Sequence, residues 1–238
     1  MPTKDTVKVN GNSAKLIEVA ADKKQAVVVY TFNVGKAQSA LVAKDASKAT
    51  YSTISASDYE WEVLRLCNIE RAKEGLNALS MNGTLQNVCD IRVKEIKTLF
   101  SHDRPNGEDC YSAVPSSYEL KTMGENIARG QKTPEKVVED WMNSPGHRAN
   151  ILNPEYSYMG VGHSFDGNCW VQFFSNSKDI TSVTSNASRS ELSEEEIKDV
   201  YFTITASNGY VSYLPADFAS MKKVGDKYYP RLAAKTLP

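Results

Sequence analysis

Two histidines and one glutamate lie in sequence settings that could support chemistry. They are His102 in "LFSHDRPNG", Glu125 in "MGENIARG" and His147 in "SPGHRANIL". His147 is near the predicted start of a short helix, where the helix dipole disfavours the imidazolium and keeps the ring neutral. A neutral imidazole ligates metal ions or acts as a general base. If the fold brings the three residues together, they could build a divalent metal site.

A purely structural role is the alternative for each residue, and for any one of them it is the more common role. A histidine at a helix start can cap that helix, and Glu125 can accept hydrogen bonds from unpaired backbone amides. The same segments contain no clear nucleophile, because Ser101 and Ser144 adjoin the histidines without lying in a G-x-S-x-G elbow. Most of the cysteines fall in predicted helices or strands, which disfavours thiol catalysis.

Helices and a hairpin are predicted around these residues. Apolar residues recur at helical spacing in the first two helices, and Arg92 lies within the stripe of the second. A long loop over residues 101–123 follows, and "YMGVGHSF" and "CWVQFFS" then alternate as strands around a "DGN" turn. Helices followed by paired strands predict an α+β fold. The helix start signals are Ser57 with Glu60 as a capping box, the segment after "MNGT", Thr133-Pro134 and Ser144-Pro145.

The sequence divides into residues 1–56, 57–177 and 178–238. The first segment reads as short strands and a small, polar linker, and the last as a Ser- and Thr-rich linker followed by a hairpin around Asn208-Gly209. The middle segment carries the predicted helices. Because neither flank is long enough to bury much core alone, we expect the flanks to pack together or onto the middle segment.

Composition excludes some classes of function. Lys plus Arg number 28 against 29 for Asp plus Glu, and scattered basic residues with a net charge of -1 give no electrostatic case for nucleic acid. No apolar run is long enough for a transmembrane segment or for the core of a signal peptide. We therefore expect either a cytosolic protein or an exported one from which the signal has been removed.

The 4 cysteines are widely spaced and form no CxxC pair, which argues against a zinc knuckle or a thioredoxin-like site. Cys67 and Cys89 fall on apolar helical stripes, where a buried thiol and a disulfide are about equally expected. If any pair is bonded, Cys110 in a polar loop and Cys169 in a strand are the favoured partners.

The motifs "SHDRPNG", "GENIA", "WMNSPGHRANILNP", "MGVG" and "WVQFF", in this order, resemble the CAP superfamily. That superfamily comprises the cysteine-rich secretory, antigen 5 and pathogenesis-related 1 proteins, and "SPGHRANIL" is similar to its bacterial branch of SCP-like extracellular proteins. The resemblance runs from about Asp58 to Asn176, half of the chain. It implies an α-β-α sandwich with a small antiparallel sheet and a surface cleft lined by two histidines and two acids.

By motif, His102 and Glu125 match the first histidine and the first acid of that cleft, and His147 matches the second histidine. The second acid falls at Ser144, a departure that resembles other bacterial members. It leaves a weaker metal site and removes paired-carboxylate chemistry. His163 matches no cleft position and is expected to be an ordinary strand residue.

The resemblance favours a secreted or cell-surface bacterial protein that acts as a non-enzymatic binding module. The cleft would hold an apolar small molecule, a peptide or a glycan, and the flanking strands could contact a cell wall or a surface partner. His102 and His147 would hold Zn²⁺ or another divalent cation. A second hypothesis is a structural cleft with the function on the outer surface. A third is a metal-dependent, peptidase-like hydrolase in which Glu125 is the general base. The implied export also favours a bond between Cys110 and Cys169.

Overall fold

The computed structural model describes backbone and side chains of residues 56–118, 122–176, 185–186, 200–207 and 209–222. Elsewhere it describes only the positions of strands. These are β1 (Lys8–Val9), β2 (Asn12–Ser13), β3 (Lys15–Val19), β4 (Gln25–Val29), β5 (Phe32–Asn33), most of β10 (Ile180–Ser185), the end of β13 (Met221–Val224), β14 (Lys227–Pro230) and β15 (Ala234–Lys235).

Helices form where the capping signals predict them. The backbone N–H of Ser57 donates to Glu60 Oε2 at 2.6 Å, and Ser57 Oγ accepts from the backbone N–H of Glu60 at 3.4 Å, which completes the predicted capping box. Asn82 and Thr133 cap the next two helices through their side-chain oxygens. The helices are α2 (Asp58–Lys73), α3 (Gly83–Thr98), α4 (Pro134–Asn143) and α5 (Pro145–Ile151), with short 3-10 helices η1 (Cys110–Ala113) and η2 (Phe218–Ser220).

These helices pack on a mixed, seven-stranded sheet with the strand order β10-β11-β12-β6-β8-β9-β7. Strand β6 runs parallel to β8, and the other neighbouring strands are antiparallel. The α+β class is therefore confirmed, although the sheet is larger than the small antiparallel one that the resemblance implies. The remaining strands are β6 (Ser80–Asn82), β7 (Met123–Arg129), β8 (Tyr158–Ser164), β9 (Cys169–Ser175), β11 (Tyr201–Ala206) and β12 (Val211–Pro215).

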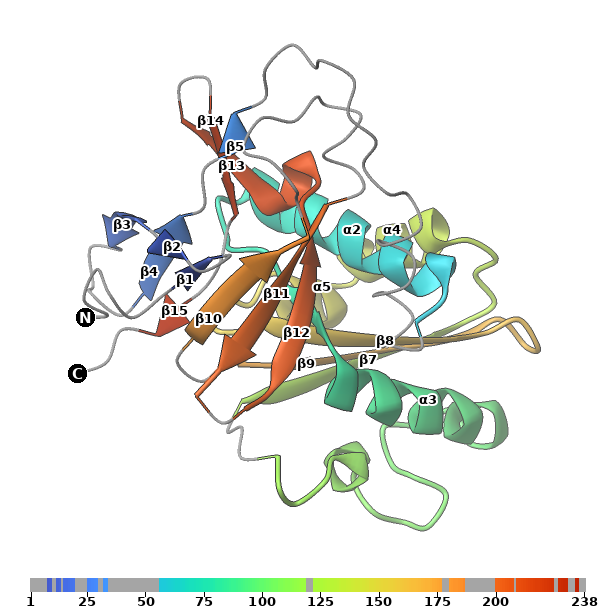
Figure 1. Cartoon of the computed structure of the whole chain (residues 1–238). Coiled ribbons are helices and arrows are strands. Elements are labelled where there is room, and N and C mark those ends of the chain that lie inside the picture. The colour runs from blue at the N-terminus through green and yellow to red at the C-terminus, as the bar shows by residue number, and fades with distance from the viewer. Residues whose placement is uncertain are drawn as a thin grey trace.

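The helices cover both faces of the sheet. Figure 1 shows α3 on one side and α2 and α4 on the other, and a separate cluster of buried hydrophobic side chains lies on each side. Close packing of α3 depends on glycine in β8, because a Cβ added to Gly162 would lie 2.6 Å from the carbonyl oxygen of Cys89. The three-layer arrangement fixes β7, at the edge of the sheet, between the α3 side and the α5 side.

The two flanking segments pair with each other, and the C-terminal one also pairs with the central sheet. Strand β12 pairs with β6 in the register Ser212 to Asn82 and Tyr213 to Met81, so the C-terminal strands extend the central sheet. The N-terminal strands β4 and β5 pair with the C-terminal strands β15 and β14. The division into three segments at residues 56 and 177 remains a prediction, and its second boundary separates strands of one sheet.

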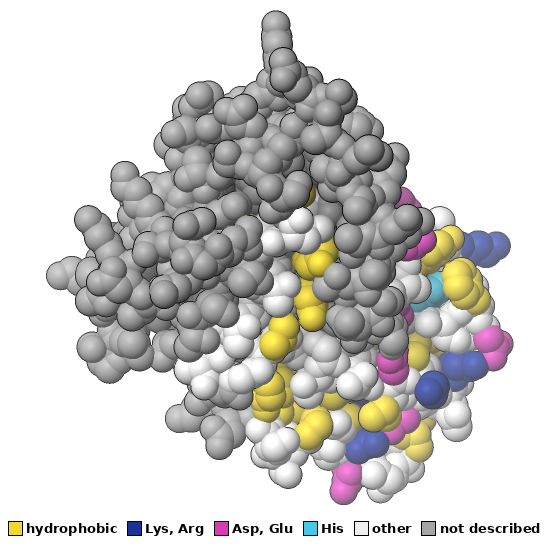
Figure 2. Space-filling model, viewed as in Figure 1, with side chains coloured by type: hydrophobic (Ala, Val, Ile, Leu, Met, Phe, Trp, Pro, Cys, Tyr) yellow, Lys and Arg dark blue, Asp and Glu magenta, His cyan; other side chains and the backbone are white. Residues whose placement is uncertain are grey.

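The surface of the described residues is mixed in charge. On the face seen in Figure 2, basic and acidic side chains are interspersed around the region of α3. Within the described part of the chain, none of the helices has the length and apolar character needed to cross a membrane.

Candidate functional site

Glu125 is the buried centre of the candidate site. It lies in β7 and is 5 % exposed. Arg92, which is fully buried in α3, reaches both carboxylate oxygens: Nε donates to Oε1 at 2.8 Å and Nη2 donates to Oε2 at 3.4 Å. A buried carboxylate is costly to remove from water unless a cation or hydrogen bonds compensate it. Glu125 is therefore anchored by an ion pair that joins β7 to α3.

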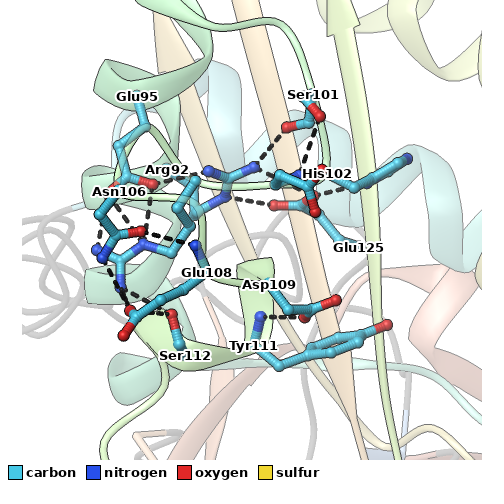
Figure 3. Close-up of polar contacts among 12 residues, drawn as sticks. Arg92, Glu95, Ser101, His102, Asn106, Glu108, Asp109, Tyr111, Ser112 and Glu125 are labelled. Atoms are coloured by element: carbon cyan, nitrogen blue, oxygen red, sulfur yellow. Dashed lines mark hydrogen bonds and ion pairs between the residues drawn. The ribbon is translucent and has the colours of Figure 1, made fainter.

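His102 continues this contact toward the surface. Its Nδ1 lies 2.7 Å from Glu125 Oε2, and its side chain is 57 % exposed. The hydrogen bond to Glu125 raises the pKa of His102, although partial burial opposes the effect. In Figure 3 the second ring nitrogen of His102 points away from Glu125. The structure thus brings two of the predicted site residues into direct contact.

The loop that carries His102 is tied to α3 by charged side chains. Arg92 Nη2 donates to the carbonyl oxygen of Ser101 at 2.8 Å, and Arg92 Nη1 donates to Glu95 Oε2 at 2.7 Å. Arg104 Nη2 donates to Glu95 Oε1 at 2.7 Å, and Arg104 Nη1 donates to Ser112 Oγ at 3.0 Å. This network gives the long loop a defined path and fixes the backbone beside His102.

Cys110 also lies in the site. Ligand atoms of His102, Cys110 and Glu125 all lie within 4.8 Å of one another, and no other such group of three occurs in the part of the chain that the structure describes. Cys110 begins η1 and is 2 % exposed. Burial, followed by the charge of Glu125, raises the pKa of its thiol well above the ordinary value. The thiol is therefore protonated at neutral pH unless a cation binds to it.

His147 enters from the other side of β7, on the short helix α5. The side chain of Asn126 donates to the carbonyl oxygen of His147 at 3.2 Å, and Asn150 Nδ2 donates to the carbonyl oxygen of Glu125, also at 3.2 Å. Burial lowers the pKa of His147, and the charge of His102 lowers it further. The lowered pKa favours the neutral ring that the sequence predicts, although its causes are burial and His102 rather than the helix dipole. His147 lies outside the group formed by His102, Cys110 and Glu125.

Ser144 and His163 both lie outside the cluster of His102, Cys110 and Glu125. Ser144 ends α4 and precedes α5, it is half-buried, and its backbone N–H donates to the carbonyl oxygen of Trp141 at 3.1 Å. The ring of His163 stacks on Trp170 at a centroid distance of 3.8 Å and on Tyr59 at 5.3 Å. Ser144 therefore occupies a helix junction, and His163 belongs to an aromatic cluster in another part of the domain.

The expected disulfide between Cys110 and Cys169 is absent. All four cysteines are buried free thiols. Cys110 is beside Glu125, which pairs with Phe173, whereas Cys169 lies four residues away along β9. The preference for these two residues as disulfide partners is therefore not met in this structure, in which both thiols are free.

Two residues of the site, Arg92 and Cys110, are not predicted from the sequence. The sequence places Arg92 within an apolar helical stripe. A cation at a buried helical position requires an acidic partner, and this requirement could have predicted an ion pair for Arg92. For Cys110 the sequence predicts only a possible disulfide with Cys169. Its position eight residues after His102 in a loop gave no signal for a contact with Glu125, which lies in a separate strand.

Sequence comparison identifies the domain that holds this site. The cysteine-rich secretory protein (CAP) family matches residues 64–176. This domain belongs to the CAP superfamily. The chain is similar to the uncharacterized protein YkwD of Bacillus subtilis (strain 168), with 42 % identity over 135 residues, or 56 % of this chain and 52 % of YkwD.

Two further relatives show the same partial coverage. The uncharacterized membrane protein YlbC of Bacillus subtilis (strain 168) is 31 % identical over 106 residues, or 43 % of this chain and 31 % of YlbC. A solved structure, an extracellular protein containing a SCP domain from Bacillus anthracis str. Ames, has 26 % identity and a TM-score of 0.47. The similarity covers 58 % of this chain and 45 % of that one. The CAP domain and its neighbouring residues thus span about half of the length of YkwD and less than a third of YlbC.

Proposed function

We propose that this chain is a secreted, non-enzymatic binding module whose CAP cleft, formed by His102, Glu125 and His147, binds a divalent metal ion together with a small or apolar ligand. The observation that carries the proposal is the buried pair of Arg92 and Glu125, which holds the carboxylate 2.7 Å from His102 Nδ1. The description of the matching family as secretory supports an extracellular location.

The hydrogen bonds of Glu125 to Arg92 and His102 favour a binding function over a hydrolytic one. A general base must have an oxygen within reach of the water from which it takes a proton. Both oxygens of Glu125 are already engaged, Oε1 by Arg92 and Oε2 by His102. A carboxylate bonded to one nitrogen of an imidazole fixes the ring and its tautomer, and metal-binding histidines are commonly oriented in this way. Glu125 is therefore better suited to position His102 than to activate water.

The surroundings of His102 support access by an ion and a ligand. The His102 side chain is more than half exposed, and the lowered pKa of His147 keeps that neighbouring ring in the neutral form that binds metal. Leu99, Phe100 and Tyr111 are exposed by 42 %, 47 % and 38 %, and they lie in the two segments that carry His102 and Cys110. Exposed apolar side chains beside a polar site are typical of a ligand-binding cleft.

The second hypothesis, a structural cleft, is favoured by one specific observation. Arg92 links Glu125, Glu95 and the carbonyl oxygen of Ser101, so the same residues that form the site also hold its loop in place. On this hypothesis His102→Ala lowers the melting temperature and changes no ligand binding.

Calorimetric titration of the metal-stripped full chain with Zn²⁺ near neutral pH tests the proposal. We expect saturable one-to-one binding that is lost in His102→Ala. His163→Ala is the matched control, because it removes a histidine from the aromatic cluster and should leave binding unchanged. Absence of binding in the unmodified chain would support the structural hypothesis instead.

A further inference from the structure

Cys110 places a thiol beside the histidine and the carboxylate of the CAP site. The donor atoms of His102, Cys110 and Glu125 come from three separate elements, the loop after α3, η1 and β7, and they converge within 4.8 Å. Cys110 is a free thiol, so its sulfur is available for coordination. Thiolate, imidazole and carboxylate groups are the three protein ligand types that Zn²⁺ uses.

The three donors need only small movements to share one ion. Zn²⁺ binds thiolate sulfur at about 2.3 Å and imidazole nitrogen at about 2.0–2.1 Å, so two donors on a tetrahedral ion lie roughly 3.5 Å apart. In the structure, His102 Nδ1 and Glu125 Oε2 are 2.7 Å apart, and all three donors lie within 4.8 Å. His102 has room to adjust because its side chain is 57 % exposed, whereas Glu125 is held by Arg92.

The local charges allow a cation despite the presence of Arg92. The guanidinium of Arg92 is shared between two carboxylates, because Nη1 donates to Glu95 and Nε donates to Glu125. Asp109 and Glu125 both act electrostatically on the thiol of Cys110. A divalent ion in contact with Cys110 would offset this negative charge.

We propose that Cys110 Sγ, His102 Nδ1 and Glu125 Oε2 together coordinate a thiophilic metal ion of the Zn²⁺ class. The inference rests on the proposed function and names the metal class of that site, with Cys110 as a ligand in place of His147, which lies outside the group of three. On binding, the thiol releases its proton to solvent. The Nδ1 proton also leaves, to solvent from a charged ring or through solvent to Nε2 of a neutral one, and the metal then takes the place of the hydrogen bond between Nδ1 and Oε2 that orients His102 in the metal-free site. A thiolate ligand favours Zn²⁺, Co²⁺ or Cu⁺ over Mg²⁺ and Ca²⁺, which prefer oxygen. The fourth tetrahedral position stays open for water or a ligand.

Titration with Co²⁺ tests the sulfur ligand directly. The full chain is stripped of metal, kept reduced and titrated with Co²⁺ while its near-ultraviolet absorption is recorded, because a thiolate bound to cobalt gives a charge-transfer band. We expect the band to saturate at one equivalent, to be absent in Cys110→Ser and to persist in Cys169→Ser, which removes another buried thiol. Addition of Zn²⁺ should displace the cobalt and abolish the band, whereas Mg²⁺ at the same concentration should not.

The possible outcomes separate this inference from the proposed function. If Co²⁺ binds at one equivalent without the band, and Cys110→Ser binds as the unmodified chain does, the thiolate ligand is disproved and the metal-binding cleft stands. If neither Co²⁺ nor Zn²⁺ binds, both proposals fail. Absence of the band in the unmodified chain disproves the thiolate ligand even if Cys110→Ser does not fold.

Discussion

Arg92 Nε and Glu125 Oε1 are 2.8 Å apart in the interior of the CAP domain, although 33 positions separate the two residues in the sequence. The side chains of both are almost completely buried, at 0 % and 1 % exposure. The pair fastens the edge strand β7 to α3 and at the same time holds the carboxylate against His102. One interaction therefore serves the stability of the domain and the geometry of its site.

Arg92→Met is expected to destabilise the protein by about 3–5 kcal/mol, because it leaves the buried carboxylate of Glu125 without its cation. Urea denaturation measures the loss. Lys73→Met is the control, since it breaks an exposed ion pair with Glu70 at 2.6 Å, and such pairs contribute roughly 0–1 kcal/mol. Equal losses in the two variants would contradict the role assigned to Arg92.

The features of the fold and of the site that the sequence does not predict depend mostly on contacts between residues far apart in the chain. The capping residues Ser57 and Thr133 act on amides within three positions, so the helix starts are predictable. Strand β7 is not predicted, because Gly124 and Asn126 interrupt its apolar pattern, and its stability comes from pairing with β9. The contact between Arg92 and Glu125 likewise depends on the packing of a helix on a strand, which no local pattern specifies.

His102 is expected to have the highest pKa of the three histidines. The hydrogen bond to Glu125 raises its pKa, whereas burial lowers the pKa of His147 and of His163. This contact therefore stabilises the fold fully below the unfolded-state pKa of His102, and the contribution is lost as the pH rises through its folded-state pKa. An NMR titration of the imidazole signals measures the order directly.

Glu125→Gln should lower the pKa of His102 toward its ordinary value and leave that of His163 unchanged. His163 is an internal control, since its ring lies in the cluster with Trp170. A pKa of His102 below that of His147 in the unmodified chain would contradict the hydrogen bond on which the site depends.

Glu60 makes stability depend on pH near neutrality. Burial raises the pKa of this carboxyl from 4.5 to about 7, even though it accepts hydrogen bonds from the backbone N–H groups of Ser57 and His163. Because the folded state binds the proton more tightly, the stabilisation is fully present below pH 4.5 and is lost as the pH rises to about 7. The change amounts to about 3 kcal/mol.

Chemical denaturation between pH 4 and 8 measures this effect. The free energy of unfolding should depend less on pH in Glu60→Gln than in the unmodified chain. Glu139 is an exposed residue of α4, and Glu139→Gln should behave as the unmodified chain.

The C-terminal strands are expected to stabilise the CAP domain and the loop of its site. Tyr210 Oη donates to the carbonyl oxygen of Ser117 at 2.7 Å, and Ser80 Oγ donates to Ser212 Oγ at 2.9 Å. Tyr213 packs against the hydrophobic core on the α2 side and Tyr210 against the core on the α3 side. Removal of these strands would expose the edge of β6 and both aromatic contacts.

A chain of residues 57–176 should therefore melt at a lower temperature than the full chain, as measured by circular dichroism. Deletion of residues 225–238 alone is the matched control. It removes β14 and β15, which pair with β5 and β4, and it leaves the pairing of β12 with β6 intact. We expect this shorter deletion to cost less stability than the truncation to residues 57–176. The truncation exposes an edge of the central sheet, which loses both backbone hydrogen bonds and apolar burial. An unchanged melting temperature for residues 57–176 would show that the CAP domain is independent of its flanks, and that the shared sheet contributes nothing to its stability.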